Sequence, residues 1–179
     1  GIKKIVVCTK AYQTRVGGGP MPTENFGKFG NYVRQKGDEV GTRSGRARRC
    51  GGIDLPLVSY GINVLGLSKN DEVALTKLDV LSGINQIPVC IAYKHKGKQF
   101  KMPPRTDAQF LEKAKPIYTY LKGWKKDISS IRKFADLPSE AKNYILFIQK
   151  LLNQRITIVG VGKHKDAIKA YDDVINNYP

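Results

Sequence analysis

Short apolar runs bounded by turn residues recur along this chain, and such runs predict buried strands. The clearest run is IKKIVVCT at residues 2–9, which is rich in β-branched side chains. Residues 94–98 read KHKGK, and the glycine in this segment predicts the tip of a hairpin. Further strands are predicted at residues 72–76, 86–93, 99–102, 116–121 and 155–161.

Helical periodicity is clearest after Asp136, where apolar residues fall three or four positions apart. Gly37 and Asp54 are suited to cap two shorter helices, one at its end and one at its start. The alternation of strands and helices indicates an α/β fold, part of it antiparallel. The apolar stripe of the long helix is predicted as Ala141, Tyr144, Ile145, Ile148 and either Leu151 or Leu152. The other helices are predicted at residues 25–36, 54–65, 107–114 with Thr106 as its cap, and 165–176.

Composition narrows the class of partner and of compartment. A length of 179 residues fits one ordinary domain, and a net charge of +16 predicts anionic partners such as nucleic acid, a membrane surface or small phosphorylated and carboxylated molecules. No run approaches the roughly 20 apolar residues of a membrane span, and no signal peptide is recognised. Cys8, Cys50 and Cys90 lie far apart without a metal-binding pattern. We therefore expect reduced thiols, no zinc site and a cytoplasmic location.

Residues 41–52 read GTRSGRARRCGG, and this glycine-bounded segment contains four arginines. Arg46 and Arg48 can each donate a fork of hydrogen bonds to a carboxylate or a phosphate. The glycines permit close backbone approach and movement, and Thr42 and Ser44 add hydroxyl donors. Composition leaves three interpretations open: a substrate loop that closes over anions, a solvated basic loop, or a loop that contacts nucleic acid phosphates.

The segment Thr76-Lys77-Leu78-Asp79 ends a predicted strand and has the residue types of a guanine site. One carboxylate can accept hydrogen bonds from both N1–H and the 2-amino group of guanine, a pair that adenine lacks. A lysine stem can lie over the base while its charge stays near oxygen acceptors. The alternative is a solvated strand end, with Asp79 capping the next turn.

Two glycine segments offer weaker signals. Gly17-Gly18-Gly19-Pro20 can cradle a ligand or form a tight turn, but the chain has no phosphate loop of the GxxxxGK[ST] type. Backbone amides at residues 159–162 (VGVG) can bind an anion or a base edge.

Other residues that can carry chemistry give no catalytic pattern. The two histidines, His95 and His164, each lie between lysines, which indicates the surface, and Trp124 is interpreted as a packing residue. No paired carboxylates and no nucleophile with a base stand out.

In their order along the chain, these motifs resemble the adenylosuccinate synthetase family. The similarity runs from about Lys4 to Ile168 and matches only the C-terminal part of that enzyme, roughly its last two-fifths. The matching motifs are KAY at 10–12, TRVGGGP at 14–20, PTE at 22–24, GR at 45–46, RRCG at 48–51, ID at 53–54, ALTKLDVL at 74–81, VCIAY at 89–93 and GW at 123–124.

The resemblance implies one region, residues 1–179, that forms the C-terminal portion of a P-loop-GTPase-like α/β fold. It implies a mixed sheet with flanking helices and an antiparallel hairpin, without the N-terminal phosphate-loop part. The implied reaction is GTP-dependent ligation of IMP and L-aspartate to adenylosuccinate in purine (AMP) biosynthesis, with magnesium as cofactor. Catalytic residues and magnesium ligands are expected outside this chain, so the chain alone is expected to be incomplete for catalysis. The complete enzyme is expected to be a cytoplasmic homodimer.

The resemblance also assigns binding residues. Aspartate and IMP would be bound by Val16, Thr42, Arg43, Ser44, Gly45 and Arg46. GTP would be bound by Arg48, Lys77, Leu78, Asp79, Gly160, Val161 and Gly162.

The sequence departs from the family at several of these positions. Arg43 replaces a small hydroxyl residue, and Ser44 stands at another usual threonine, which puts aspartate affinity and loop closure in question. Gly52 stands where tryptophan is common, and Gly160 and Lys163 stand where serine and proline are usual. Two other functions stay open: the net charge of +16 leaves a basic nucleic-acid-binding module, and the altered loop residues leave a catalytically inactive nucleotide-binding paralogue.

Overall fold

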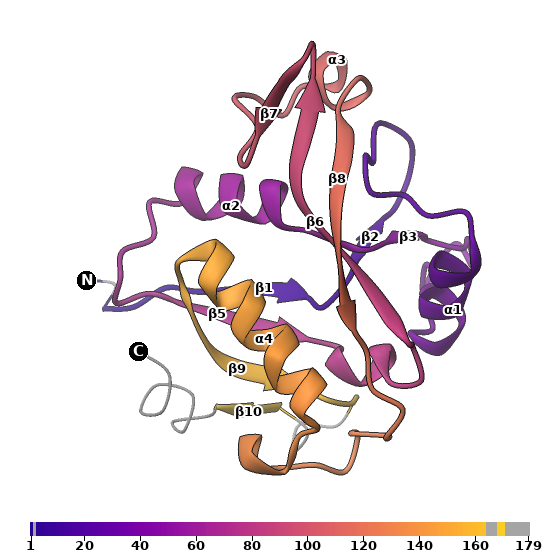
Figure 1. Cartoon of the computed structure of the whole chain (residues 1–179), viewed down its shortest axis with the longest axis vertical. Helices are drawn as coiled ribbons and strands as arrows, with labels where there is room; N and C mark the ends of the chain where they lie inside the picture. Colours follow the sequence, from indigo (N-terminus) through magenta and orange to yellow (C-terminus); the bar gives the residue numbers. More distant parts are fainter. Residues whose placement is uncertain (2, 164–167, 171–179) are drawn as a thin grey trace. The chain divides into compact units, whose positions relative to one another are not determined.

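The computed structural model describes residues 1, 3–163 and 168–170, which belong to two compact units. Unit 1 contains Gly1–Ala11, Gly61–Gln86 and Leu121–Pro179, and unit 2 contains Tyr12–Tyr60 and Ile87–Tyr120. Each unit has both helices and strands, with parallel and antiparallel strand pairs in the chain (Figure 1). The predicted mixed α/β class is therefore confirmed.

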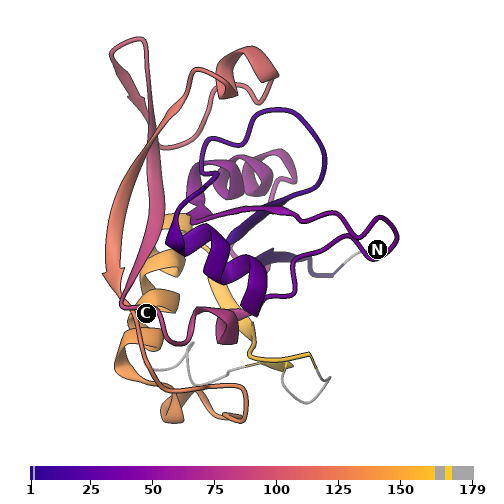
Figure 2. The ribbon, with the colours of Figure 1, turned by 90° about the vertical axis from the view of Figure 1, so that its right-hand side faces the viewer.

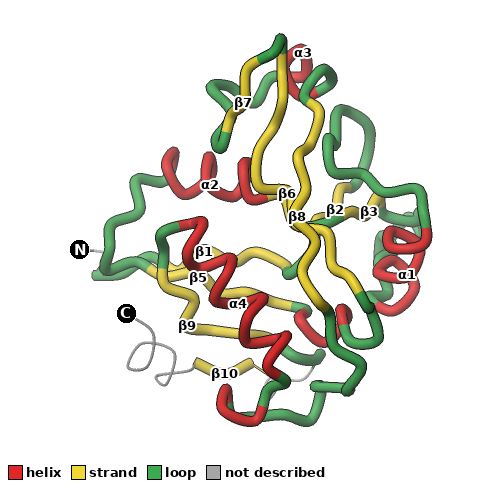
Figure 3. The backbone as a smooth tube through the Cα atoms, in the orientation of Figure 1, coloured by secondary structure: helices red, strands yellow, loops and turns green. Residues whose placement is uncertain are grey.

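The sheet of unit 1 has the strand order β1-β5-β9-β10. Its strands are β1 (Val6–Lys10), β5 (Glu72–Thr76), β9 (Arg155–Gly160) and β10 (Ile168–Ala170). The first three are parallel, and β10 is antiparallel to β9. Figure 3 shows β1, β5 and β9 side by side in yellow, so their carboxyl ends share one edge of the sheet.

The long helix α4 (Ser139–Leu152) packs its apolar stripe into the core of unit 1. It is also hydrogen-bonded to the residue that follows β1, since the hydroxyl of Tyr144 donates to the carbonyl of Ala11 at 2.6 Å. The stripe is as predicted, with Leu152 buried and Leu151 43% exposed. The helix begins three residues after Asp136, which instead ends a short 3-10 helix (Phe134–Asp136).

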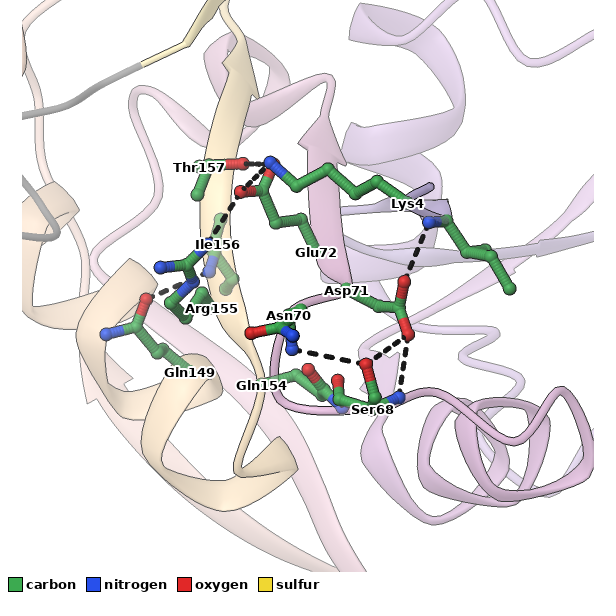
Figure 4. Close-up of polar contacts among 11 residues, drawn as sticks. Lys4, Ser68, Asn70, Asp71, Glu72, Gln149, Gln154, Arg155, Ile156 and Thr157 are labelled. Atoms are coloured by element: carbon green, nitrogen blue, oxygen red, sulfur yellow. Dashed lines mark hydrogen bonds and ion pairs between the residues drawn. The ribbon is translucent and has the colours of Figure 1, made fainter. Parts of the chain in front are cut away.

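A network of charged and polar side chains joins the amino ends of β5 and β9 (Figure 4). Lys4 contacts Glu72 at 2.5 Å, Arg155 contacts the same carboxylate at 2.9 Å, and Thr157 donates to it at 2.7 Å. Burial acts to raise the pKa of Glu72, but the hydrogen bonds from Lys4 and Thr157 outweigh it and hold the pKa below its usual value. This network stabilises the end of the sheet opposite its carboxyl edge.

Unit 2 contains a short antiparallel pair and one amphipathic helix. The pair is β2 (Gln13–Arg15) with β3 (Arg49–Gly51), and neither strand was predicted, because three-residue strands carry too little periodicity. The helix α1 (Lys28–Lys36) ends at Gly37 as predicted. It begins three residues later than predicted, because the side chain of Asn25 accepts hydrogen bonds from the backbone at its start.

The second sheet of unit 2 is built around the long strand β6 (Gln86–His95), which reaches unit 1 at its first residue. It pairs with β4 (Ile53–Asp54) in parallel, with β7 (Lys98–Phe100) in a hairpin, and with β8 (Lys115–Lys122). Figure 2 shows β6 and β8 running side by side. The predicted hairpin and the predicted strand near 116–121 are confirmed.

Two helices border this sheet. In α2 (Leu55–Val64), Asp54 accepts a hydrogen bond from the backbone N–H of Leu57 at 3.2 Å, which confirms it as the N-cap. In α3 (Ala108–Leu111) the cap is Asp107 rather than the predicted Thr106, and the helix is shorter than predicted.

Residues 168–170 form a strand, so the predicted helix over 165–176 is wrong there, and its other residues lie outside the described part of the chain. Cys8, Cys50 and Cys90 are free thiols. Within residues 1, 3–163 and 168–170, no helix is both long and apolar enough to cross a membrane.

Candidate functional site

The two segments predicted to surround a guanine lie side by side at the carboxyl edge of the unit 1 sheet. Strand β5 leads into residues 77–79, and its parallel neighbour β9 leads into residues 160–162. A Cβ atom built on Gly160 would lie 3.4 Å from Thr76 Cα and 3.7 Å from the backbone nitrogen of Lys77. Ligands of α/β sheets bind at this edge, so the topology brings the candidate residues to a suitable place.

The turn after β5 has a special backbone. Lys77 has a φ of 58°, in the left-handed region, and a 3-10 helix (Leu78–Leu81) follows. Leu78 is fully buried, while the side chains of Lys77 and Asp79 are half-buried. The turn therefore anchors its leucine in the core and leaves the lysine and the aspartate at the sheet edge.

The Gly123-Trp124 pair is hydrogen-bonded to the residues that follow the 3-10 helix. The indole N–H of Trp124 donates to Ser82 Oγ at 3.0 Å, and the backbone N–H of Gly83 donates to the Trp124 carbonyl at 2.7 Å. Trp124 is 3% exposed, which confirms it as a packing residue. A Cβ atom at Gly123 would lie only 2.0 Å from the carbonyl oxygen of Ile84, so this position requires glycine.

The arginine loop of unit 2 is closed by its own backbone. Val40 and Ala47 form an isolated antiparallel bridge, and the N–H of Gly41 donates to the carbonyl of Arg46 at 2.9 Å. Gly45 has a φ of 62°, which explains a glycine at the tip. Residues 42–46 are all exposed, so Thr42, Arg43, Ser44, Gly45 and Arg46 stand in solvent.

The four arginines of this segment fall into two classes, which composition did not separate. Arg49 donates to Glu24 at 2.8 Å and to the carbonyl of Gly19 at 2.6 Å, and the hydrogen bond to Glu24 raises its pKa. Arg48 is bound to Glu39. Arg43 and Arg46 have no ion pair with any residue that the structure describes, so these two can bind an external anion.

Arg48 belongs to a buried network that sequence analysis missed. Its Nη1 donates to Oε2 of Glu39 at 2.7 Å, and the hydroxyl of Tyr12 donates to Oε1 of the same carboxylate at 2.6 Å. Glu39 is 0% exposed. The only signal in the sequence was a carboxylate placed just before the loop, and such carboxylates are common.

The glycine loop after β2 is held by arginine side chains. Arg15 donates to the carbonyls of Gly18 and Pro20 at 3.0 and 3.1 Å, and Gly17 and Gly19 have φ values of 80° and 90°. The left-handed backbone at Gly17 and Gly19 requires glycine, and the Arg15 hydrogen bonds hold the segment as a turn. Val16 is 68% exposed, which is unusual for an apolar side chain and leaves its surface accessible to a ligand.

Of the two histidines, only His95 lies in the described part of the chain. His95 is half-buried with its ring 4.8 Å from that of Phe110, so its predicted placement as a purely surface residue is wrong. His164 lies outside the described residues. Across residues 1, 3–163 and 168–170, no group of three or more His, Cys, Asp or Glu side chains is arranged to hold a metal ion.

The sequence is similar to curated proteins named adenylosuccinate synthetase. The adenylosuccinate synthetase of Arthrobacter sp. (strain FB24) is 43% identical over 176 residues, which cover 98% of this chain and 40% of that protein. The adenylosuccinate synthetase of Thermobifida fusca is 44% identical over 165 residues, which cover 92% of this chain and 38% of that protein. This chain therefore spans about 40% of the length of the curated relatives it matches.

A solved structure and a family model agree with these relatives. The structure of fully ligated adenylosuccinate synthetase from Plasmodium falciparum matches with a TM-score of 0.83 and 40% identity, over 90% of this chain and 38% of that one. The family model for adenylosuccinate synthetase matches residues 1–169. The nucleic-acid-binding alternative is not favoured by any of these similarities, and the chain belongs to the adenylosuccinate synthetase family.

Proposed function

We propose that the protein joins IMP and L-aspartate into adenylosuccinate with GTP, in purine biosynthesis, and that this chain supplies the guanine pocket and the aspartate loop. The observation that carries the proposal is the meeting of residues 77–79 and 160–162 at the carboxyl edge of a parallel sheet, in a member of this family. The activity and substrates come from the family and from the chemistry of these residues.

The guanine pocket follows from the residues at this edge. Asp79 is half-buried, so its carboxylate can accept hydrogen bonds from N1–H and the 2-amino group of guanine with little competition from water. The stem of Lys77 lies over the base, and buried Leu78 fixes the turn between them. The backbone of Gly160, Val161 and Gly162 covers the other edge of the base.

The aspartate loop is the exposed segment 42–46 of unit 2. Arg46 binds the carboxylates of aspartate and the bound IMP, and Arg43 adds a second cation at a position where the family has a hydroxyl. Thr42 and Ser44 donate hydroxyl hydrogen bonds, and the glycines permit closure. The backbone at Val16 lies against the IMP ribose, and Arg48 binds GTP.

Several parts of the proposal lie beyond this chain. We expect residues outside it to supply the catalytic groups, the magnesium ligands and the phosphate loop of a P-loop-GTPase-like fold. Magnesium would neutralise the phosphate charge of GTP. We also propose a homodimer in the cytoplasm, where three free thiols such as these stay reduced.

The test is a change of base preference in the natural protein that carries this sequence. Asp79→Asn exchanges an acceptor for a donor, so we expect GTP affinity to fall at least tenfold and xanthosine triphosphate, whose 2-oxo group accepts a hydrogen bond, to bind better than GTP. Asp136→Asn, an exposed change in the same unit, serves as the matched control. An Asp79→Asn protein that still prefers GTP would reject the guanine assignment.

A further inference from the structure

At the base of the arginine loop, the buried carboxylate of Glu39 holds one end of the Arg48 guanidinium in an ion pair. The carboxylate of Glu39 is fully buried, and it binds Arg48 through Oε2 at 2.7 Å and Tyr12 through Oε1 at 2.6 Å. Each carboxylate oxygen therefore has its own donor. The side chain of Arg48 is 27% exposed, so its remaining surface reaches solvent.

Backbone contacts fix the same two residues. The N–H of Arg48 donates to the carbonyl of Glu39 at 2.9 Å, the N–H of Glu39 donates to the carbonyl of Arg34 at 2.9 Å, and Nε of Arg34 donates to the carbonyl of Arg48 at 2.9 Å. These bonds form a closed ring around the two ends of the loop. The two ends of the loop are therefore fixed to each other and to the end of helix α1.

The sequence before the loop is shaped to admit the Tyr12 hydroxyl. A Cβ atom at Gly37 would lie 2.3 Å from that hydroxyl oxygen, so only glycine leaves room for it. Asp38 has a φ of 52°, and this left-handed turn directs Glu39 inward. The carboxylate is thus held from both sides, by Tyr12 and by Arg48.

Stability alone does not explain a charged group at this position. A buried ion pair is costly to desolvate, and apolar side chains of similar volume often stabilise a core as well or better. A guanidinium has five N–H donors, and Glu39 takes only part of them. Nε of Arg48 is buried and has no hydrogen-bond partner among the described residues, so the donors that remain for an external anion lie on the 27% of the side chain that is exposed.

We propose that Glu39, held by Tyr12, is a positioning residue that orients the Arg48 guanidinium toward a phosphate group of the bound nucleotide. The inference rests on the proposed role of Arg48 in GTP binding. An arginine without this clamp samples many rotamers and loses that freedom when it binds, whereas a clamped one is already oriented.

The experiment is a double-mutant cycle measured by calorimetric GTP binding to the natural protein that carries this sequence. Glu39→Gln keeps the shape of the side chain and removes its charge, so we expect about tenfold weaker GTP binding. In an Arg48→Gln background the same change should have no further effect, because Glu39 acts through Arg48. Equal losses in both backgrounds, or none in either, would overturn the proposal.

Glu24→Gln is the matched control, because Glu24 forms the neighbouring ion pair with Arg49 in the same unit. A purely structural role predicts that both glutamate variants lower the melting temperature and that neither couples to Arg48 in GTP affinity. If Glu39→Gln does not fold, Tyr12→Phe takes its place in the same cycle, with an expected loss of about threefold. An Arg48→Gln protein with unchanged GTP affinity would instead reject the proposed role of Arg48, and with it the positioning role.

Discussion

The hydroxyl of Tyr93 donates a hydrogen bond of 2.5 Å to Oδ2 of Asp54, and both side chains are fully buried. Thr23 donates to the same oxygen at 3.3 Å, and the backbone N–H of Leu57 donates to the other one. Burial raises the pKa of Asp54 to about 6, although these hydrogen bonds act in the opposite direction. The carboxylate that caps α2 therefore has a pKa well above the usual range of aspartate.

The raised pKa of Asp54 predicts a pH-dependent stability. Between about pH 4 and pH 6 the unfolded chain ionises this group while the folded protein keeps it protonated, so stability falls as the pH rises through this window. The expected loss is about 3 kcal/mol in the free energy of unfolding, from a shift of about two pH units. Asp54→Asn should flatten this part of the profile, as measured by urea unfolding at several pH values.

Asp38→Asn is the control for this experiment, since it is an exposed aspartate of the same unit at a left-handed position that asparagine tolerates. We expect it to keep the wild-type slope between pH 4 and pH 6. A wild-type slope in Asp54→Asn would show that other groups cause the pH dependence.

Two glycines of unit 1, Gly160 and Gly123, should differ in how much stability is lost when a side chain is added. At Gly160 an added Cβ meets Thr76 at an ordinary contact distance of 3.4 Å, so Gly160→Ser, which restores the usual family residue, should change the melting temperature little. At Gly123 it would lie 2.0 Å from a backbone oxygen, so Gly123→Ala should destabilise the protein by roughly 3 kcal/mol or more. Thermal unfolding of both variants checks this, and equal melting temperatures would contradict the close packing at Gly123.

The residues proposed to bind guanine could be placed at the carboxyl edge of the sheet from the sequence, because local signals were enough. A short apolar run predicted strand β5 at its observed bounds, and the residues after it had to leave the sheet at its carboxyl end. The left-handed Lys77 and the 3-10 helix after it were not foreseen, because no glycine or proline marks this turn. Packing of buried Leu78 determines the backbone there.

The arginine loop shows where sequence reasoning stopped. Arg46 and Arg49 have the same side chain, and only the fold decides that Arg49 meets Glu24, which lies 25 positions earlier. The partner of Arg48 is nine positions away, and its burial also depends on tertiary packing. Composition therefore predicted anion binding for the segment but could not separate its structural arginines from its exposed ones.

Adjacent leucines at the end of α4 give a direct test of the buried face. Leu152 is 6% exposed and Leu151 is 43% exposed, so the helical stripe turns inward at the second of them. Leu152→Ala should cost about 2–5 kcal/mol of unfolding free energy, and Leu151→Ala about 0.5 kcal/mol or less. Chemical denaturation of the two variants measures the difference, and a larger loss for Leu151→Ala would place the wrong face of the helix in the core.

Arg46 and Arg49 should separate substrate binding from stability. Arg49→Leu removes the hydrogen bonds that Arg49 donates to Glu24 and to the carbonyl of Gly19. We therefore expect a loss of about 1–3 kcal/mol in the free energy of unfolding. Arg46 is exposed, so Arg46→Leu should leave the melting temperature unchanged but raise the KM for aspartate at least tenfold in the natural protein that carries this sequence. Thermal unfolding and steady-state kinetics of both variants test this. Normal aspartate dependence in Arg46→Leu would reject the assignment of residues 42–46 as the aspartate loop. The side chain of Arg46 is exposed, so a loss of stability would not obscure this result.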